Sequence, residues 1–288
     1  ALAKLRGFGA ISRIGAVFRP NAIGASTLAA MAVPAERLDT VARYVSEFRE
    51  VNHNYEREHR LNMWFVVAAP EPGRLKQVLD SIARTTGLGV IALPLVEEFH
   101  IDLGFDLRGE GVKRVSGGPP PRVAIGPSGQ RLVAALQEGL DLVPRPYTVL
   151  AARAGLAERE VLDTLAKWQA LGLVRRFGVV VRHHELGFGA NAMCVWDVPD
   201  AQVHALGEAL ATEAAMTLCY RRTRVPPQWR YNLYCMLHGR ERTEVVGKLS
   251  DIAERQGLGG CPHDVLFSVR RFKQTGARYA EVEAPRNG

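Results

Sequence analysis

The sequence predicts an α+β fold built as a tandem repeat, in which each half joins a winged helix-turn-helix to a ferredoxin-like βαββαβ module. One observation is the similarity of residues 1–19 and 165–182, which aligns Gly15 with Gly178, 163 residues apart. This period is too long for a solenoid, so it indicates a duplicated or fused domain pair. The other observation is that the order strand-helix-strand-strand-helix-strand follows in both halves, which is the ferredoxin-like unit. The first winged helix is expected to be incomplete, because the chain begins inside what reads as a helix, and we expect a segment upstream.

Alternation of apolar residues, with proline at helix starts and glycine at helix ends, predicts the elements of both modules. In the first half we expect strands at 27–33, 52–60, 63–69 and 89–99 and helices at 35–50 and 73–87. In the second half we expect strands at 192–198, 217–224, 231–237 and 265–272 and helices at 201–211 and 241–256.

A Pro/Gly-rich stretch at 116–121 reads as a linker between the halves. Apolar residues at helical spacing then predict three helices at 128–139, 146–155 and 158–171, followed by a hairpin at 173–182 that completes a winged helix-turn-helix. The expected units are a winged-helix remnant at 1–20, ferredoxin-like domains at 21–114 and 184–276, a linker at 115–127, the second winged helix at 128–183 and a loose tail at 277–288.

Composition restricts the class of protein. The chain has 288 residues, of which 47% are hydrophobic and 23% charged, so it is globular. No apolar run approaches the about 18–20 residues of a membrane span, and we expect no membrane partner. The net charge of +7 suits nucleic acid, anionic lipid or a polyanionic small molecule without choosing among them. Four cysteines without a C-x-x-C pair favour reduced thiols in a cytoplasmic protein and no metal site.

The candidate recognition helix argues against nucleic acid. Its first turns, within 158–167, carry three acidic residues and one arginine. Base and phosphate contacts would be made there and require Lys or Arg. We therefore expect no nucleic-acid partner and regard the helix-turn-helix as a scaffold.

Two highly polar strands organise the sequence, at 52–60 and 217–224. Strand side chains alternate between faces, so one face of the first strand is expected to carry His53, Tyr55, Arg57 and His59. The aligned face of the second is expected to carry Leu218, Tyr220, Arg222 and Arg224. A solvated or interface strand explains this pattern as well as a pocket for a large anion does.

A winged helix joined to a ferredoxin-like module resembles the Lrp/AsnC regulators, and longer motifs point further. Residues 176–187 and 229–239 resemble one subunit of siroheme decarboxylase, and residues 13–17, 51–59 and 100–107 resemble the other. The resemblance implies a fused enzyme of haem d1 or alternative haem biosynthesis. That family removes CO2 from the acetates at carbons 12 and 18 of siroheme, giving 12,18-didecarboxysiroheme. One departure is Leu218, where the family usually has histidine.

The resemblance implies a site for siroheme, which carries eight carboxylates around an iron macrocycle. Arginine fits carboxylate bidentately, so Arg57 and Arg222 are expected to hold carboxylates that do not react. His53 is the expected proton donor, with Tyr55 as the alternative. The remaining candidates for substrate binding are His59, Tyr220, Arg221, Arg224 and Tyr231. No cofactor is expected, since the iron belongs to the substrate.

Other histidines and one other function stay open. His100 could ligate iron or cap a strand, and His183 and His184 could be polar turn residues. The two halves are expected to form an intrachain pseudo-dimer, with a further homodimer and other haem d1 enzymes as possible partners. The alternative function is a ligand-sensing Lrp/AsnC-type transcriptional regulator.

Overall fold

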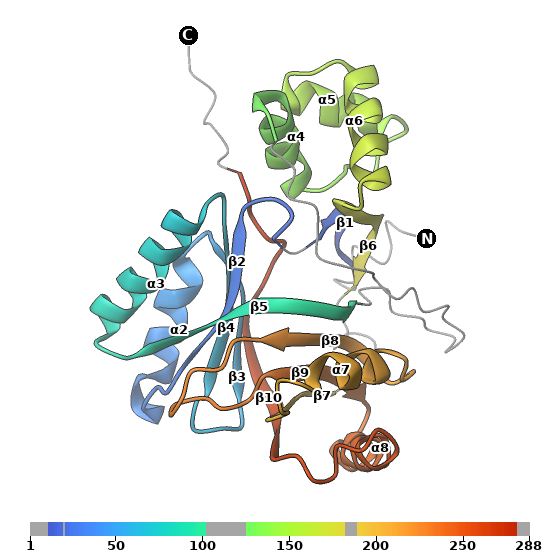
Figure 1. The fold of residues 1–288 in the computed structure, drawn as a ribbon. Helices are drawn as coiled ribbons and strands as arrows, with labels where there is room; N and C mark the ends of the chain where they lie inside the picture. The colour runs from blue at the N-terminus through green and yellow to red at the C-terminus, as the bar shows by residue number, and fades with distance from the viewer. Residues whose placement is uncertain (1–10, 20, 102–124, 182–188, 281–288) are drawn as a thin grey trace.

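The computed structural model describes residues 11–19, 21–101, 125–181 and 189–280, which form an eight-stranded barrel carrying a small helical domain (Figure 1). The predicted linker lies outside the described residues as far as residue 124. None of the helices in the described part of the chain is long and apolar enough to cross a membrane.

Both halves contain the predicted βαββαβ order, and the predicted fold class is confirmed. The elements of the first half are β2 (Ala25–Met31), α2 (Leu38–Glu47, after the short helix η1, Ala35–Arg37), β3 (Val51–Arg57), β4 (Met63–Ala69), α3 (Pro72–Thr86) and β5 (Val90–Ile101). Those of the second half are β7 (Ala190–Trp196), α7 (Val203–Ala211), β8 (Met216–Arg222), β9 (Leu233–Gly239), α8 (Arg242–Arg255) and β10 (His263–Gln274).

The two four-stranded sheets close on each other into one barrel, in the order β10-β3-β4-β2-β5-β8-β9-β7. The long last strand of each half provides the closure, because β5 pairs antiparallel with β8 and β10 pairs with β3. Neither sheet has a free edge at these seams. The two halves therefore form a single pseudo-twofold unit within one chain.

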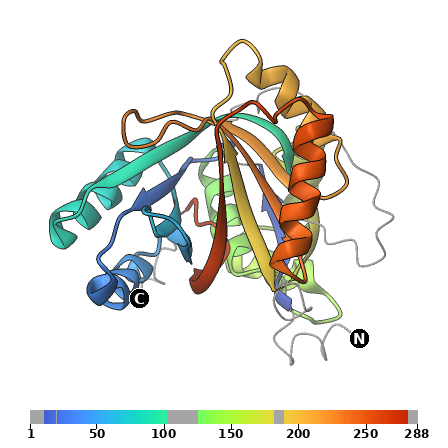
Figure 2. The ribbon, with the colours of Figure 1, turned by 90° about the horizontal axis from the view of Figure 1, so that it is seen from below.

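Helices cover the barrel from outside, and the inner face has a core of its own. Figure 2 shows the helices of the two halves on opposite outer sides of the barrel. The outer cores include Phe65 beneath α2 and α3, and Trp196 beneath α7 and α8. The inner core gathers Trp64, Trp229 and Tyr234 with aliphatic residues from both halves.

The helical domain consists of α4 (Pro127–Gln137), α5 (Pro146–Ala154) and α6 (Glu158–Ala170). Prolines begin α4 and α5, and Gly155 ends α5 at φ 62°, a conformation that glycine adopts without strain. The predicted hairpin at 173–182 is wrong. Residues Val174–Val181 form one strand, β6, which pairs antiparallel with β1 (Ile11–Phe18).

The pairing of β1 with β6 joins the two copies of the repeated stretch. Gly15 and Gly178, which the repeat aligns, lie directly opposite each other in the ladder. Strand β1, which lies in the predicted winged-helix remnant, thus supplies the partner that a hairpin would have supplied. A partner 163 positions away leaves no local turn signal in the sequence.

The C-terminal segment corrects another expectation, because hydrogen bonds hold part of the tail predicted as loose at 277–288, at Tyr279 and Ala280. The Gln137 side chain on α4 accepts hydrogen bonds from the backbone N–H groups of Tyr279 and Ala280 and donates to the Ala280 carbonyl. The Tyr279 ring passes Gly24, where a Cβ atom would lie 2.9 Å from the ring. Residues 275–280 therefore tie the helical domain to the barrel.

Candidate active site on the inner face of the barrel

The inner face of β3 carries three of the four polar side chains expected there. Tyr55 lies opposite Trp64 of the inner core, so both side chains leave the sheet on the same side. The His53 and Tyr55 rings stack at 6.2 Å, and the Arg57 guanidinium lies 5.8 Å from the Tyr55 ring centre. The intervening Asn54 points the other way and donates to the Ala42 carbonyl on α2.

Arg57 and Arg222 occupy equivalent places in the two halves. The Nη1 atom of Arg57 donates to the Leu266 carbonyl on β10 at 2.8 Å. The Nη1 atom of Arg222 donates to the Leu93 carbonyl on β5, also at 2.8 Å. Arg222 lies 5.1 Å from the Tyr220 ring, as Arg57 lies over Tyr55.

Matching asparagines hold these two arginines at equivalent depths. The Asn62 side chain exchanges hydrogen bonds with the backbone N–H and carbonyl of Val33, and Asn232 does the same with Val198. The backbone carbonyls of Asn62 and Asn232 accept hydrogen bonds from the backbone N–H groups of Arg57 and Arg222, respectively, both at 2.8 Å. Each asparagine therefore fixes the turn that follows its polar strand.

Neither guanidinium has a carboxylate partner among the described residues, and Arg57 is buried whereas Arg222 is partly buried. Arg57 is 7% exposed, and burial lowers its pKa to about 10. Burial also lowers the pKa of Arg222, whose Nε atom has no hydrogen-bond partner. A buried charge is costly unless it is paired, so this face is a candidate site for anionic groups.

The groups beside Arg57 are held in their neutral forms. Burial lowers the pKa of His53 to about 4, so its imidazole is uncharged at neutral pH. Burial raises the pKa of Tyr55, although the charges of Arg57 and Arg271 oppose this shift. The Tyr55 phenol therefore keeps its proton and can donate a hydrogen bond at neutral pH.

An aromatic cluster closes one end of the barrel interior. Trp229, from the loop between β8 and β9, contacts the Trp64 and Tyr231 rings at 4.9 Å and donates from Nε1 to the Tyr234 hydroxyl at 2.5 Å. The His59 ring packs edge-on against Trp229 at 5.4 Å, and its Nε2 atom lies 3.4 Å from an Asp264 carboxylate oxygen. His59 and Tyr231 thus belong to this closed end.

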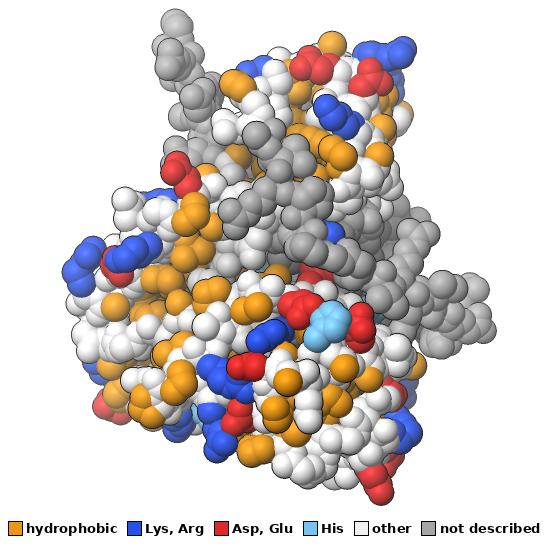
Figure 3. Space-filling view, in the orientation of Figure 1, with side chains coloured by type: hydrophobic (Ala, Val, Ile, Leu, Met, Phe, Trp, Pro, Cys, Tyr) orange, Lys and Arg blue, Asp and Glu red, His pale blue; other side chains and the backbone are white. Residues whose placement is uncertain are grey.

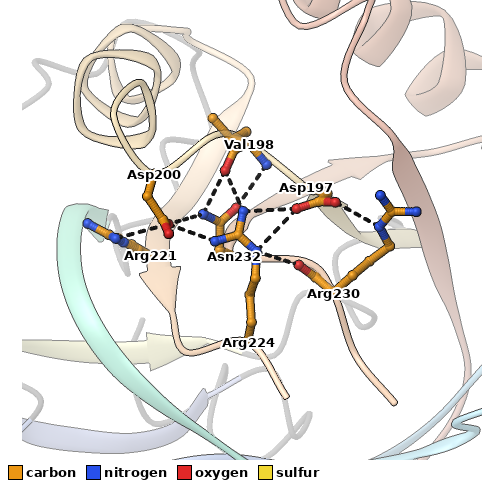
Figure 4. Close-up of polar contacts among 7 residues, drawn as sticks. All are labelled: Asp197, Val198, Asp200, Arg221, Arg224, Arg230 and Asn232. Carbon is orange, nitrogen blue, oxygen red and sulfur yellow. Dashed lines mark hydrogen bonds and ion pairs between the residues drawn. The ribbon is translucent and has the colours of Figure 1, made fainter. Parts of the chain in front are cut away.

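Two arginines predicted to bind the substrate form ion pairs with aspartates instead (Figure 4). Arg224 lies beyond the end of β8 and forms ion pairs with Asp197 at 2.9 Å and Asp200 at 2.7 Å. Arg221 alternates away from Arg222 and pairs with Asp200 at 3.1 Å. The expectation that Arg224 shares the inner face with Arg222 is therefore wrong. The ion pairs of Arg224 instead fix the loop that carries Trp229.

The other candidate groups do not gather on the inner face. His100 is buried opposite Cys219, which contacts the Gly207 carbonyl on α7, so His100 lies on the outer side of the sheet. His183 and His184 lie outside the described residues. All four cysteines are free thiols, and within the described ranges no group of three or more His, Cys, Asp or Glu could hold a metal ion.

The inner face also carries polar residues that the sequence reading missed. Arg271 on β10 lies directly opposite Tyr55, and its Nη1 atom donates to the Gln274 side chain at 3.1 Å. On β9, His238 contacts Asn191 at 3.1 Å and the Thr217 hydroxyl at 3.2 Å. The alternation of side chains along β9 from Tyr234 would have predicted that His238 faces inward. The inward position of Arg271 could not be predicted in this way, because bulges interrupt the alternation along β10.

The fold and this face define a class of ligand-binding protein. The AsnC-like ligand binding domain matches residues 22–100 and 185–273, one copy in each half of the barrel. The siroheme decarboxylase NirDL-like HTH domain matches residues 129–175.

Individual relatives make the family specific. The chain is 44% identical to the siroheme decarboxylase NirDL subunit of Paracoccus denitrificans, over 98% of this chain and 87% of the relative. A crystal structure of the siroheme decarboxylase NirDL superposes with a TM-score of 0.71 at 28% identity, covering 97% of this chain and 82% of that one. A second structure, of NirDL in complex with an iron-uroporphyrin III analogue, gives 0.70 at 28% identity, over 96% and 82%. The chain belongs to the siroheme decarboxylase family.

Proposed function

We propose that this chain decarboxylates siroheme, removing CO2 from the acetates at carbons 12 and 18 to give 12,18-didecarboxysiroheme for haem d1 or alternative haem biosynthesis. The observation that carries the proposal is the pair of inward-facing guanidiniums of Arg57, which is buried, and Arg222, which is partly buried; both lack a carboxylate partner among the described residues. Siroheme brings eight carboxylates to such a face. The complex of the related NirDL with an iron-uroporphyrin III analogue supports the same class of ligand.

In this proposal Arg57 and Arg222 hold carboxylates that do not react. Each has one nitrogen on a backbone carbonyl and further N–H groups for a carboxylate. A tight ion pair to the reacting acetate would stabilise its ground state and slow the loss of CO2. The reacting acetates therefore lie away from both guanidiniums.

The reaction needs an electron sink and a proton. The bond between the methylene and the carboxylate carbon breaks, CO2 leaves, and the electron pair on the methylene is delocalised into the macrocycle. A proton then adds to this carbon and produces a methyl group. The iron and the conjugated ring belong to the substrate, so the proposal includes no resident cofactor.

His53 is the proposed proton donor, and Tyr55 is the alternative. In the unliganded protein burial holds His53 neutral, with a pKa of about 4. Carboxylates of a bound substrate favour the imidazolium and raise this pKa, so proton uptake accompanies binding. Tyr55 keeps its proton throughout, since burial raises its pKa.

Anaerobic incubation with siroheme tests the proposal. The absorption spectrum is expected to change on binding, and mass spectrometry is expected to show a product lighter by two CO2 molecules. Tight binding with an unchanged substrate mass would contradict the enzyme proposal and favour a ligand sensor. A cytoplasmic location fits the four free thiols, and the second half supplies the pseudo-dimer partner within the chain.

The regulator alternative receives little support from the helical domain. The outer face of α6 exposes Glu160 and Asp163 beside Arg159 and Lys167. Figure 3 shows acidic, basic and apolar side chains intermixed over this domain on the visible face. Phosphate binding requires a concentration of Lys and Arg, and a mobility shift with duplex DNA is expected to show no specific complex.

A further inference from the structure

The last strand, β10, turns a positive side chain toward the proposed siroheme site. Cross-strand pairing places Ser268 opposite Arg57, Arg271 opposite Tyr55 and Gln274 opposite His53. Directly opposite residues of an antiparallel pair project on the same side of the sheet. Three polar residues of β10 therefore share the inner face with the three polar residues of β3.

Register irregularities between Ser268 and Arg270 and between Arg271 and Lys273 produce this arrangement. A bulge inserts an extra residue and interrupts the simple alternation of faces. Consequently Arg270 points outward to the Asp39 carboxylate at 2.7 Å, and Lys273 donates to the Ser46 and Phe48 carbonyls near α2. Arg271, between them, is the cation that faces inward.

Arg271 is oriented by its surroundings on the inner face. Its Nη1 atom donates to the Gln274 side chain at 3.1 Å, which fixes one edge of the guanidinium. Its charge acts on the Tyr55 phenol together with that of Arg57. Two guanidiniums thus flank one tyrosine, in a geometry suited to two carboxylates on one edge of a macrocycle.

The equivalent place in the second half has the opposite charge. Glu98 on β5 lies directly opposite Tyr220, as Arg271 lies opposite Tyr55. Leu95 lies opposite Arg222, where Ser268 lies opposite Arg57. A carboxylate at this place disfavours a substrate carboxylate, whereas an arginine favours one.

We propose that Arg271 binds a carboxylate of siroheme, and that Glu98 excludes a carboxylate from the equivalent place in the second half. The proposal deepens the function proposed above and rests on it. The pseudo-twofold barrel offers two similar faces, and this pair of residues selects one of two orientations of the macrocycle. The orientation selected places a carboxylate-bearing edge beside His53 and Tyr55.

Charge exchange tests the proposal, with anaerobic absorption titration of siroheme giving Kd and mass spectrometry giving turnover. Arg271→Glu is expected to raise Kd about 30-fold or more, and the uncharged Arg271→Gln is expected to raise it less. Adding Glu98→Arg to Arg271→Glu is expected to recover at least about tenfold of the lost affinity. Turnover stays low in the double variant, because His53 lies in the first half.

The matched control is Arg270→Gln, which changes the neighbouring cation on the outer face and is expected to leave Kd unchanged. Thermal unfolding checks that each variant is folded. The inference would be overturned if Kd is unchanged in both Arg271 variants, or if the double variant recovers no affinity. In either case the wild-type protein would still turn over siroheme, so the proposed function would stand. A wild-type protein that leaves siroheme unchanged would instead contradict the proposed function.

Discussion

Replacing Arg57 by methionine is expected to separate substrate affinity from stability. Methionine keeps an unbranched side chain and removes the charge. In the folded protein this guanidinium is 7% exposed, and no carboxylate among the described residues compensates it. The substitution therefore removes an unpaired buried charge that destabilises the unliganded protein. It also removes a group that binds an anion.

The expected change in stability is small because opposing effects nearly cancel. Burial lowers the pKa of Arg57 from its ordinary value to about 10, which opposes the charged form by about 3 kcal/mol. Methionine removes that penalty but loses the hydrogen bond to the Leu266 carbonyl, worth about 1.5–3 kcal/mol for a charged donor. It also loses the contact with the Tyr55 ring, worth about 1 kcal/mol. The free energy of unfolding should change by no more than about 1–2 kcal/mol.

The expected change in affinity is much larger. Loss of one partner from a buried ion pair costs about 2–5 kcal/mol, which raises Kd for siroheme about 30-fold to several thousandfold. Arg222→Met should act in the same direction, because Arg222 has the equivalent hydrogen bond to Leu93. Lysine at either position should restore only part of the affinity, since it lacks the planar fork.

Anaerobic titration of siroheme and denaturant unfolding, applied to the same protein preparations, measure both quantities. Arg255→Met is the matched control, because this exposed arginine pairs with Glu213 on the outer surface. It should change neither quantity by much. Unchanged affinity in both the Arg57 and Arg222 variants would refute the reasoning. So would a loss of several kcal/mol of stability, which would show that the arginines hold the fold.

Further predictions concern the proton donor, the loop and the C-terminal segment. His53→Leu should bind siroheme but lower turnover about 10²–10⁴-fold in a mass-spectrometric assay, whereas near-normal turnover would shift the donor role to another residue. The pKa of His53 is about 4 when folded and near its ordinary 6.5 when unfolded, so the unfolded chain binds more protons between these two pH values. The free energy of unfolding, measured by urea titration, should therefore fall as the pH is lowered from 6.5 to 4. This fall should be smaller in His53→Leu. Arg224→Ala should lower stability by about 1–3 kcal/mol and increase quenching of Trp229 fluorescence by added iodide; unchanged quenching would argue against the loop-fixing role. Gln137→Ala should cost about 1–2 kcal/mol and speed proteolysis of the C-terminal segment, and equal cleavage rates would count against its anchoring.

Local patterns in the sequence were sufficient to predict the repeat and the polar strand of the first half. Alternation over β3 places His53, Tyr55 and Arg57 together because this strand pairs regularly with β4 from residue 53 to residue 56. The same reasoning fails for Arg224, since β8 ends at Arg222 and the chain then turns toward Asp197 and Asp200. Alternation has no predictive value beyond the end of a strand.

Long-range contacts explain the other differences. Arg271 faces inward because of two irregularities in the pairing of β10 with β3, which carry no local sequence signal. The wing is formed by β1 and β6, which are separated by an entire repeat. Residues 275–280 are ordered because Gln137 binds their backbone from a different domain. Each outcome depends on a partner more than 130 positions away, which local patterns do not contain.

Fusion of the two halves in one chain has a chemical consequence for the proposed site. Two identical subunits would place the same residues on both faces of the barrel, and a macrocycle could then enter in two equivalent orientations. Here His53 has Leu218 as its counterpart, and Arg271 has Glu98, while the Tyr55 and Tyr220 rings remain matched. Siroheme itself has no twofold symmetry, because its two reacting acetates lie on neighbouring rings. In this barrel the equivalent arginines Arg57 and Arg222 can therefore retain the polyanion in the proposed site. The pairs that differ between the halves, His53 with Leu218 and Arg271 with Glu98, can select one orientation of the macrocycle.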